Sequence, residues 1–193
     1  MRIGVFSLQG AVQPHLARLR GLGVDALPVR TADELNVCDG LILPGGESTT
    51  LLKLIGEYQL KPALMDYARE HAVWGICAGS ILMASHVENP SQESLGLMPC
   101  TIRRNAYGRQ NESFIGEVRL FLPEPAPDQQ EAVFIRAPIF QKLDEGVTIL
   151  ARHKDTPVAI QYNRYLATTF HPELSESETF HRFFLTLCNG NHT

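Results

Sequence analysis

The chain has 193 residues, of which 44% are hydrophobic and 20% are charged, a composition that excludes a disordered tail, a fibrous repeat and a disulfide-rich miniature. The formal net charge is −4 and the 17 lysines and arginines are scattered, which argues against a nucleic-acid partner. The apolar runs are far shorter than the roughly 20 residues of a membrane span, so no membrane partner is expected either.

Strand and helix patterns alternate through the first half of the chain. The predicted strands are Arg2–Leu8, Val24–Val29, Asp39–Leu43 and Val73–Ile76. The predicted helices are one through Val12, Leu16 and Leu19, one from Ser48, one over Lys61–His71 and one over Ala78–Ser85. Strands separated by helices and joined by short loops form parallel sheets that helices cover on both faces.

The second half of the chain is mostly strand-like. The predicted elements are strands within Thr101–Phe121, Ala132–Ile135, Val147–Ala151, Val158–Tyr162 and Tyr165–Thr169, and a closing helix over Phe180–Leu187. The proline-rich stretch Leu122–Gln130 is predicted to be a surface loop. Because no repeat, low-complexity tract or linker interrupts the chain, we predict one three-layer α/β domain over residues 1–193. Its sheet is expected to be mixed, mostly parallel and flanked by helices, as in flavodoxin-like folds.

Cys77 stands in a context typical of a reactive cysteine. It follows the strand-like run Val73–Ile76, precedes a helix pattern, and has Gly75 and Gly79 two residues to either side. This is the cysteine form of the nucleophile elbow, where glycines are needed because side chains would crowd the sharp turn. The N-terminus of the following helix also favours the thiolate, the reactive form. The alternative is a small buried residue at the end of a strand.

The other three cysteines, Cys38, Cys100 and Cys188, lack this context, and we expect them to be inert core residues. Their spacing indicates neither a disulfide framework nor a metal site, so no metal ion is expected. The chain begins on a strand-like run without the apolar core of a signal peptide. A reducing, cytoplasmic setting is therefore expected.

His171 and Glu173 follow the last predicted strand. Side chains alternate along an extended chain, so these two can point the same way. His171 could then take the proton of Cys77 while Glu173 orients the imidazole, although 94 residues separate His171 from Cys77. The alternative is a surface His-Pro turn.

A Gly-Gly pair, Gly45-Gly46, lies between a predicted strand and a predicted helix. Backbone N–H groups in such a loop can receive a developing oxyanion, and the predicted oxyanion hole consists of the N–H groups of Gly46 and Ala78. The alternative is a plain turn with Ser48 as the N-cap of the next helix.

Arginines in two polar segments are candidates for a carboxylate clamp. One segment is Arg103-Arg104-Asn105 with Gly108–Gln110, and the other places Arg136 within Phe134–Pro138. A guanidinium group pairs with a carboxylate through two parallel hydrogen bonds. The alternative is an arginine in a structural ion pair.

Taken together, these segments resemble the class I glutamine amidotransferases, whose glutaminase domain uses a Cys-His-Glu triad. More narrowly, the chain is similar to the glutaminase subunits of pyridoxal 5′-phosphate synthases from Ile3 to about His181. The matching segments are Leu8–Val12, Pro44–Thr50, Cys77–Gly79, Arg104-Asn105 with Gly108–Gln110, Phe134–Pro138 and Phe170–Leu174.

The resemblance implies hydrolysis of L-glutamine to glutamate and ammonia, with Cys77 as the nucleophile and His171 and Glu173 completing the triad. The implied glutamine-binding residues are Gly46, Glu47, Ser48, Arg104, Ile135 and Arg136. The charge of Glu47 suits the ammonium group of the substrate.

The resemblance also implies a partner and a mode of control. Gln9 and Gly10 fall where the family meets its synthase partner and organises the oxyanion hole. The implied partner is a pyridoxal 5′-phosphate synthase subunit, which would receive the ammonia in a hetero-oligomeric complex, and no cofactor is implied. The flexible Gly45-Gly46 pair motivates the hypothesis that docking turns this peptide and so completes the oxyanion hole.

Two departures from the family pattern are present. Ser80 replaces an apolar residue and Asn111-Glu112 replaces Val-Asp. We expect them to affect the pocket wall or the docking surface and not the reaction type.

Three alternative functions remain open. The chain could be the glutaminase of another amidotransferase, such as imidazole glycerol phosphate synthase, which Leu8–Val12 and Phe134–Pro138 disfavour. It could be a redox sensor or chaperone of related fold, which leaves the His-Pro-Glu segment unexplained. It could be an inactive regulatory subunit, which the complete triad disfavours.

Overall fold

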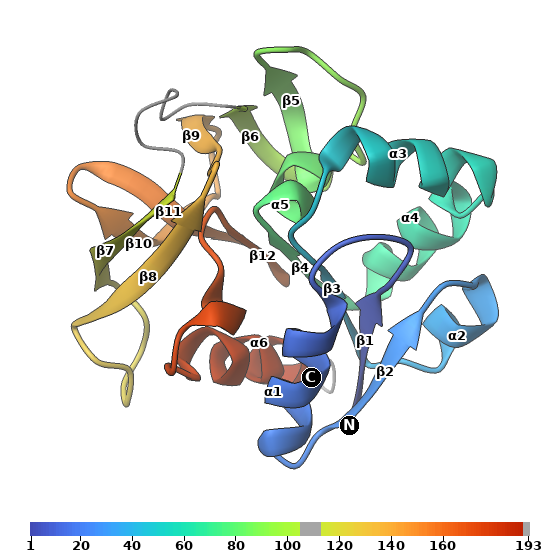
Figure 1. The fold of residues 1–193 in the computed structure, drawn as a ribbon, viewed down its shortest axis with the longest axis horizontal. Helices are drawn as coiled ribbons and strands as arrows, with labels where there is room; N and C mark the ends of the chain where they lie inside the picture. Colours follow the sequence, from blue (N-terminus) through green and yellow to red (C-terminus); the bar gives the residue numbers. More distant parts are fainter. Residues whose placement is uncertain (105–112, 191–193) are drawn as a thin grey trace.

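A nine-stranded mixed sheet forms the centre of the molecule (Figure 1). The computed structural model describes residues 1–104 and 113–190, and the strand count refers to these residues. In spatial order the strands are β2 (Asp25–Val29), β1 (Arg2–Phe6), β3 (Gly40–Leu43), β4 (Ala72–Ile76), β12 (Tyr165–Thr168), β11 (Thr156–Tyr162), β10 (Thr148–His153), β7 (Ser113–Leu120) and β8 (Gln129–Ile135). The strands from β2 to β12 are parallel, and those from β12 to β8 are antiparallel.

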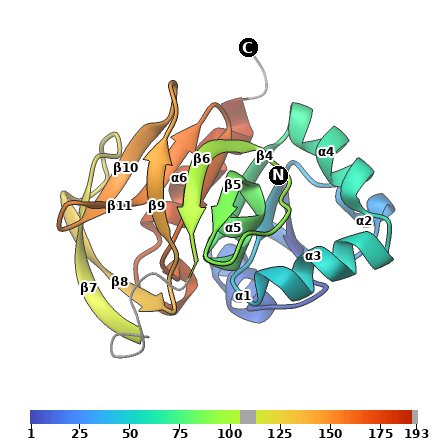
Figure 2. The ribbon, with the colours of Figure 1, turned by 90° about the horizontal axis from the view of Figure 1, so that it is seen from above.

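A second sheet of three short strands lies beside the first. It consists of β5 (Ala84–Glu88), β6 (Met98–Arg103) and β9 (Ile139–Leu143). β5 follows directly on α5 (Ala78–Met83), and Figure 2 shows the three strands next to that helix. The small sheet thereby brings the end of β6, at Arg103, to the same side of the molecule as α5.

Helices cover both faces of the parallel strands. α1 (Val12–Gly21) and α6 (Thr179–Asn189) lie side by side on one face (Figure 1). α2 (Ala32–Asn36), α3 (Ser48–Glu57), α4 (Lys61–Glu70) and α5 cover the other face. Each of these helices except α5 buries one apolar face and exposes the other, whereas all six residues of α5 are buried.

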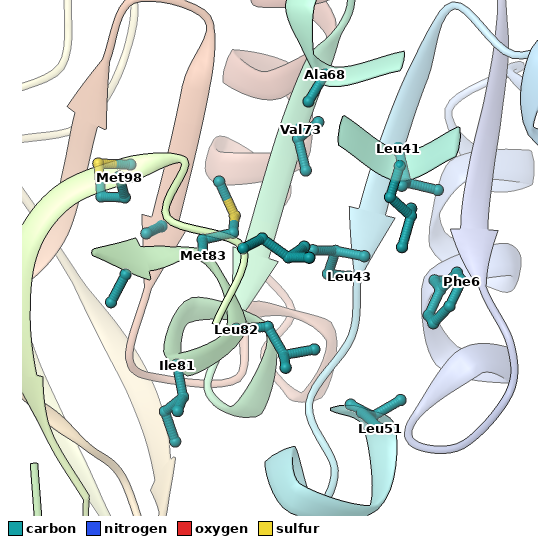
Figure 3. Close-up of a cluster of buried hydrophobic side chains, with 14 of the residues drawn as sticks. Phe6, Leu41, Leu43, Leu51, Ala68, Val73, Ile81, Leu82, Met83 and Met98 are labelled. Atoms are coloured by element: carbon teal, nitrogen blue, oxygen red, sulfur yellow. The ribbon is translucent and has the colours of Figure 1, made fainter. Parts of the chain in front are cut away.

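The alternation of side chains along the parallel strands divides the core in two. In β4, Trp74 and Ile76 pack toward α1 and α6, whereas Val73 packs toward α4. Figure 3 shows the cluster on the side of α3, α4 and α5, which includes Leu41 and Leu43 of β3 together with Leu51 and Leu82 from the helices. Apolar groups on both faces bury the strands, which explains their continuous hydrophobic runs.

The predicted α/β architecture with a mixed sheet flanked by helices is confirmed. The antiparallel part of the sheet consists of β12, β11, β10, β7 and β8, which lie where strands were predicted in the second half of the chain. The helix predicted over Ala78–Ser85 ends at Met83, and the chain enters β5 at Ala84. Four short elements were not predicted: α2, β5, β9 and the 3₁₀ helix Pro172–Leu174. Within the described residues, no helix is long and apolar enough to cross a membrane.

Candidate active site

Cys77 occupies a strained turn between β4 and α5. Its backbone has φ 49° and ψ −100°, a conformation that costs free energy in a non-glycine residue. The flanking glycines are required by close packing: a β-carbon at Gly75 would lie 2.7 Å from the backbone of Gly79, and one at Gly79 would lie 2.0 Å from the carbonyl oxygen of Leu43. The backbone N–H of Cys77 donates to the carbonyl of Thr168 at 2.8 Å. The elbow geometry expected from the Gly-x-Cys-x-Gly pattern is therefore present.

β12 brings His171 to this elbow. β12 runs parallel to β4, with Thr168 opposite Ile76, so both chains leave the sheet at the same edge. The backbone N–H of His171 donates to the carbonyl of Val133 in β8 at 2.8 Å. The chain then turns through the 3₁₀ helix Pro172–Leu174, which carries Glu173. The alternative of an exposed His-Pro turn is wrong, because His171 and Glu173 are both buried.

The imidazole of His171 pairs with Glu173 and lines the same pocket as Cys77, whose Sγ lies 3.8 Å from the carbonyl oxygen of Ile135. Its Nδ1 lies 2.7 Å from Oε1 of Glu173. Burial by itself would lower the pKa of His171, but hydrogen bonds with Cys77 and Glu173 outweigh it and raise this pKa to about 10. Burial would raise the pKa of Glu173, yet the hydrogen bond from His171 holds it below its ordinary value. The pair can therefore hold an imidazolium beside a carboxylate at neutral pH.

The Gly45-Gly46 loop closes over the imidazole. A β-carbon at Gly45 would lie 2.5 Å from Cε1 of His171, and the Gly45 carbonyl accepts the N–H of Ala11 at 2.9 Å. Gly10 has φ 111°, and a β-carbon there would lie 2.2 Å from the Gly45 oxygen. Only glycines allow these backbones to approach so closely. Residues just before α1 thus hold the loop that was expected to form the oxyanion hole.

A pocket of about 330 Å³ opens at this place. It is lined by Cys77, Ala78 and His171 and by all six predicted glutamine-binding residues: Gly46, Glu47, Ser48, Arg104, Ile135 and Arg136. Gln9, Gly10, Ala11, Gly45 and Ile81 complete the lining. Glu173 is not part of the lining, since it lies behind the imidazole. Segments far apart in the sequence therefore meet around one cavity.

Glu47 and Arg104 form an ion pair in the pocket wall, with Nη2 of Arg104 3.3 Å from Oε1 of Glu47. Glu47 is also the N-cap of α3, accepting the N–H of Thr50 at 2.8 Å, so the alternative in which Ser48 is the N-cap is wrong. Burial would raise the pKa of Glu47, but hydrogen bonds from Thr49 and Thr50 lower it to about 2. Nη1 of Arg104 is buried and has no partner among the described residues. A carboxylate in the pocket could accept its N–H groups.

The remaining residues singled out from the sequence lie outside the pocket or outside the described residues. Ser80 is buried below the elbow, where its hydroxyl donates to the carbonyls of Gly75 at 2.9 Å and Thr168 at 2.7 Å, so it does not form the pocket wall. Asn105, Gly108–Gln110 and Asn111-Glu112 are not among the described residues.

The three other cysteines are buried away from the pocket. Burial raises the pKa of Cys38 to about 11 and that of Cys100 and of Cys188 to about 12. Thiols with such pKa values carry almost no thiolate at neutral pH.

Two buried histidines near Glu173 were not predicted. His15 of α1 and His181 of α6 have no exposed surface. The sequence could have indicated that both are buried, because His15 immediately precedes Leu16 on the buried side of α1 and His181 follows the buried Phe180. A lone histidine on an apolar helix face gives no indication of which residue it contacts.

Comparisons with known proteins agree on one family. The model of the SNO glutamine amidotransferase family matches residues 5–190 of this chain. A Solibacter usitatus protein named pyridoxal 5′-phosphate synthase subunit PdxT is 47% identical over 189 residues, which cover 96% of this chain and 98% of that protein. A protein of the same name from Caldanaerobacter subterraneus is 44% identical and covers 97% of this chain and 99% of its own.

Solved structures give the same result at the level of the fold. A crystal structure described as a glutamine amidotransferase superimposes with a TM-score of 0.90 at 40% identity, covering 97% of this chain and 98% of the other. A glutamine amidotransferase from Thermotoga maritima has a TM-score of 0.61 at 16% identity, covering 98% of this chain and 83% of the other. The second likeness concerns the fold alone.

Proposed function

The chain belongs to the SNO glutamine amidotransferase family, and we propose that residues 1–193 act as the single glutaminase domain of a pyridoxal 5′-phosphate synthase. In this role the protein hydrolyses L-glutamine to L-glutamate and ammonia and supplies the ammonia to a synthase subunit. The resemblance to class I glutaminases is confirmed by the family match and by the solved structure at 40% identity. The observation that carries the proposed chemistry is the position of His171, between Cys77 and Glu173 at the pocket.

The first step is attack by sulfur. The Cys77 thiolate adds to the side-chain amide carbon of glutamine, and the amide oxygen takes up the negative charge. The N–H groups of Gly46 and Ala78, which both line the pocket beside Cys77, would hold this oxyanion. The strained turn supports this role, because it holds the sulfur at the start of α5 where Ala78 follows directly.

His171 carries out the proton transfers. As an imidazolium it donates a proton to the amide nitrogen, so that ammonia leaves and a γ-glutamyl thioester remains on Cys77. The neutral imidazole then takes a proton from water, and the hydroxide releases glutamate and the Cys77 thiolate. Glu173 holds Nδ1 of the ring at 2.7 Å and supplies the charge that stabilises the imidazolium.

Recognition of glutamine follows from the charges around the pocket. The unpartnered Nη1 of Arg104 suits the α-carboxylate of the substrate, and the ionised Glu47 suits its ammonium group. Ser48, Ile135 and Arg136 line the same pocket and would contact the rest of the substrate. A pocket of about 330 Å³ is of the size that a small amino acid requires.

A synthase partner would control this chemistry through the Gly45-Gly46 peptide. The Gly45 carbonyl is held by Ala11, and Oε1 of Gln9 accepts the N–H of Glu47 at 3.0 Å. A subunit that docks on the Gln9–Ala11 segment could break these bonds and turn the peptide, so that the N–H of Gly46 faces the oxyanion. The partner would be the synthase subunit of a hetero-oligomeric complex. Such a complex would operate in the cytoplasm, where thiols stay reduced.

Ammonia release from glutamine tests this function directly. The parent protein should release ammonia faster when the synthase subunit is added, and Cys77→Ala should release none with or without it. Cys188→Ala is the matched control, because it removes a buried thiol away from the pocket and should keep parent activity. Equal activity of the parent with and without the partner would contradict the proposed control. Activity of Cys77→Ala would contradict the proposed function itself.

A further inference from the structure

Two buried histidines that the proposed mechanism does not use lie behind the triad carboxylate. Nε2 of His15 in α1 lies 3.4 Å from Oε2 of Glu173. Nδ1 of the same ring lies 3.2 Å from Nε2 of His181 in α6. Within the described part of the chain, neither Nε2 of His15 nor Oε2 of Glu173 forms a hydrogen bond with another group, so the two buried atoms meet only through this 3.4 Å contact. A line of polar side chains thus runs from Glu173 through His15 of α1 to His181 of α6, two helices that lie side by side in Figure 1.

The order of donors and acceptors along this line is determined by the chemistry of the groups. An ionised carboxylate only accepts, so Nε2 of His15 must carry the hydrogen. In a neutral ring Nδ1 of His15 is then an acceptor, and it receives Nε2–H of His181. Burial lowers the pKa of His15 to about 4 and that of His181 to about 3, which keeps both rings neutral at neutral pH. Both N–H groups therefore point toward Glu173.

We propose that His15, held in its tautomer by His181, is a positioning residue for the catalytic carboxylate of Glu173. This inference rests on the proposed function, since it assigns the support of the same triad. Oε1 of Glu173 accepts from His171 at 2.7 Å, and Oε2 faces Nε2 of His15 at 3.4 Å. A neutral N–H of His15 directed at Oε2 would fix the carboxylate plane, and with it the orientation of His171 toward Cys77. Without His15 a buried anionic oxygen would have no donor, which costs free energy.

A neutral donor at this position has a specific advantage. A cation beside Oε2 would cancel the negative charge that His171 needs to hold its proton. A neutral N–H satisfies the oxygen and leaves the charge in place. Residue 15 therefore supports the carboxylate without competing with the imidazolium.

The other charged and titratable groups around the line do not reach Oε2. Arg18 of α1 donates to the backbone carbonyls of Ser175 and Glu176, and its charge lowers the pKa of His181. Glu178 shares a surface hollow with Glu173 but pairs with Arg182. From β4, Trp74 presents its ring to His15 and His181 at centroid distances of 6.2 and 5.0 Å.

Two substitutions separate hydrogen bonding from packing. His15→Leu removes the donor, and His15→Gln keeps an N–H group that can reach Oε2. With the synthase subunit present, His15→Leu should lower kcat by about tenfold to a hundredfold and leave KM for glutamine within about twofold. It should also move the acidic limb of the pH profile of kcat/KM to higher pH by about one unit. The reason is that a buried carboxylate that loses a donor binds its proton more tightly.

His15→Gln should keep the parent acidic limb and most of kcat. The proposal is overturned if His15→Leu leaves the acidic limb where it is in the parent, or if His15→Gln loses as much activity as His15→Leu. If His15→Leu loses activity while the acidic limb of its pH profile stays in place, His15 has a packing role only. These results are distinguishable from failure of the proposed function, which would show as ammonia release by Cys77→Ala.

A second measurement needs no substitution and decides the question if His15→Leu does not fold. In histidine labelled with ¹⁵N, two-bond proton–nitrogen NMR of the parent protein reports the tautomer of each ring. His15 should show the neutral Nε2–H form from about pH 5 to about pH 9. A His15 ring that carries its proton on Nδ1, or that becomes cationic in this range, would overturn the proposal.

Discussion

Gly45 and His171 are in such close contact that a β-carbon on the glycine would lie 2.5 Å from Cε1 of the imidazole. The Gly45-Gly46 loop, which is expected to bind the oxyanion, is thus packed directly against His171, the base of the triad. The Gly45 carbonyl also accepts the N–H of Ala11, which ties the loop to the segment before α1. The contact explains why this position needs a residue without a side chain.

Gly45→Ala should therefore displace the imidazole and lower kcat by about a hundredfold, since a shift of about 1 Å in a catalytic group has effects of this size. The fold should persist, and steady-state glutaminase kinetics with the synthase subunit measure the loss. Gly56→Ala is the control, because a β-carbon there meets nothing within 4 Å and favours the helix. Unchanged kcat in Gly45→Ala would show that the imidazole is free to move.

Arg104→Lys should raise KM for glutamine by about tenfold or more and change kcat much less. The guanidinium group leaves Nη1 buried and unpartnered at the pocket, and a lysine cannot offer the same pair of parallel donors to a carboxylate. Arg69→Lys, on the exposed face of α4, is the matched control and should behave as the parent. A Michaelis constant that Arg104→Lys leaves unchanged would remove Arg104 from substrate recognition.

The contribution of His171 to stability should depend on pH in one direction. Its pKa of about 10 in the folded chain lies above its ordinary value of 6.5. The contribution is therefore full below about pH 6.5 and is lost as the pH rises through about 10. Urea unfolding of the parent and of His171→Asn should show a difference in free energy that shrinks over this range. A difference that stays constant would mean that the imidazolium is not stabilised in the folded state.

The same experiment carried toward acid tests Glu173. The pKa of this carboxyl is held below its ordinary value of 4.5, so its contribution is present above about pH 4.5 and is lost as the pH falls through the folded pKa. The parent should lose stability in acid more steeply than Glu173→Gln. Parallel acid curves for the two proteins would contradict the paired carboxylate.

Ser80→Ala should lower the free energy of unfolding by about 1–2 kcal/mol, because two buried carbonyls lose a donor. These carbonyls belong to Gly75 in β4 and Thr168 in β12, the strands that carry the elbow and the His171 loop. Ser85→Ala, which removes one bond to Cys100 in a less buried place, should cost less than about 1 kcal/mol. If the two variants unfold alike in urea, Ser80 does not hold these strands together.

Local patterns in the sequence were sufficient for the elements that carry the site. The strand before Cys77, the glycines around it and the His-Pro-Glu segment each have a signature within a few residues, and the structure has strands and turns at these places. α2 has only five residues, although its capping box from Thr31 to Glu34 is a signal that could have located it. β5 was not predicted because its first residue, Ala84, continues the apolar run Ile81–Met83 of α5.

Relationships between distant residues could not be predicted in the same way. Nothing in the sequence indicates that β12 lies next to β4, which is the pairing that brings His171 to Cys77. The motif resemblance supplied this relationship indirectly. The contact of His15 with Glu173 had no such guide, because 158 residues of chain separate them and the contact depends on how α1 and α6 pack together. Contacts between side chains on separate elements require the three-dimensional structure.

The central claim is that glutamine is hydrolysed through a thioester on Cys77, and the most direct test is to isolate this intermediate. The parent protein, turning over glutamine with the synthase subunit, is quenched in acid, and its peptides are analysed by mass spectrometry. We predict one γ-glutamyl group on the peptide that contains Cys77 and none on the peptides of Cys38, Cys100 and Cys188. Ammonia released while Cys77 stays unmodified, or a glutamyl group found on another residue, would contradict the account.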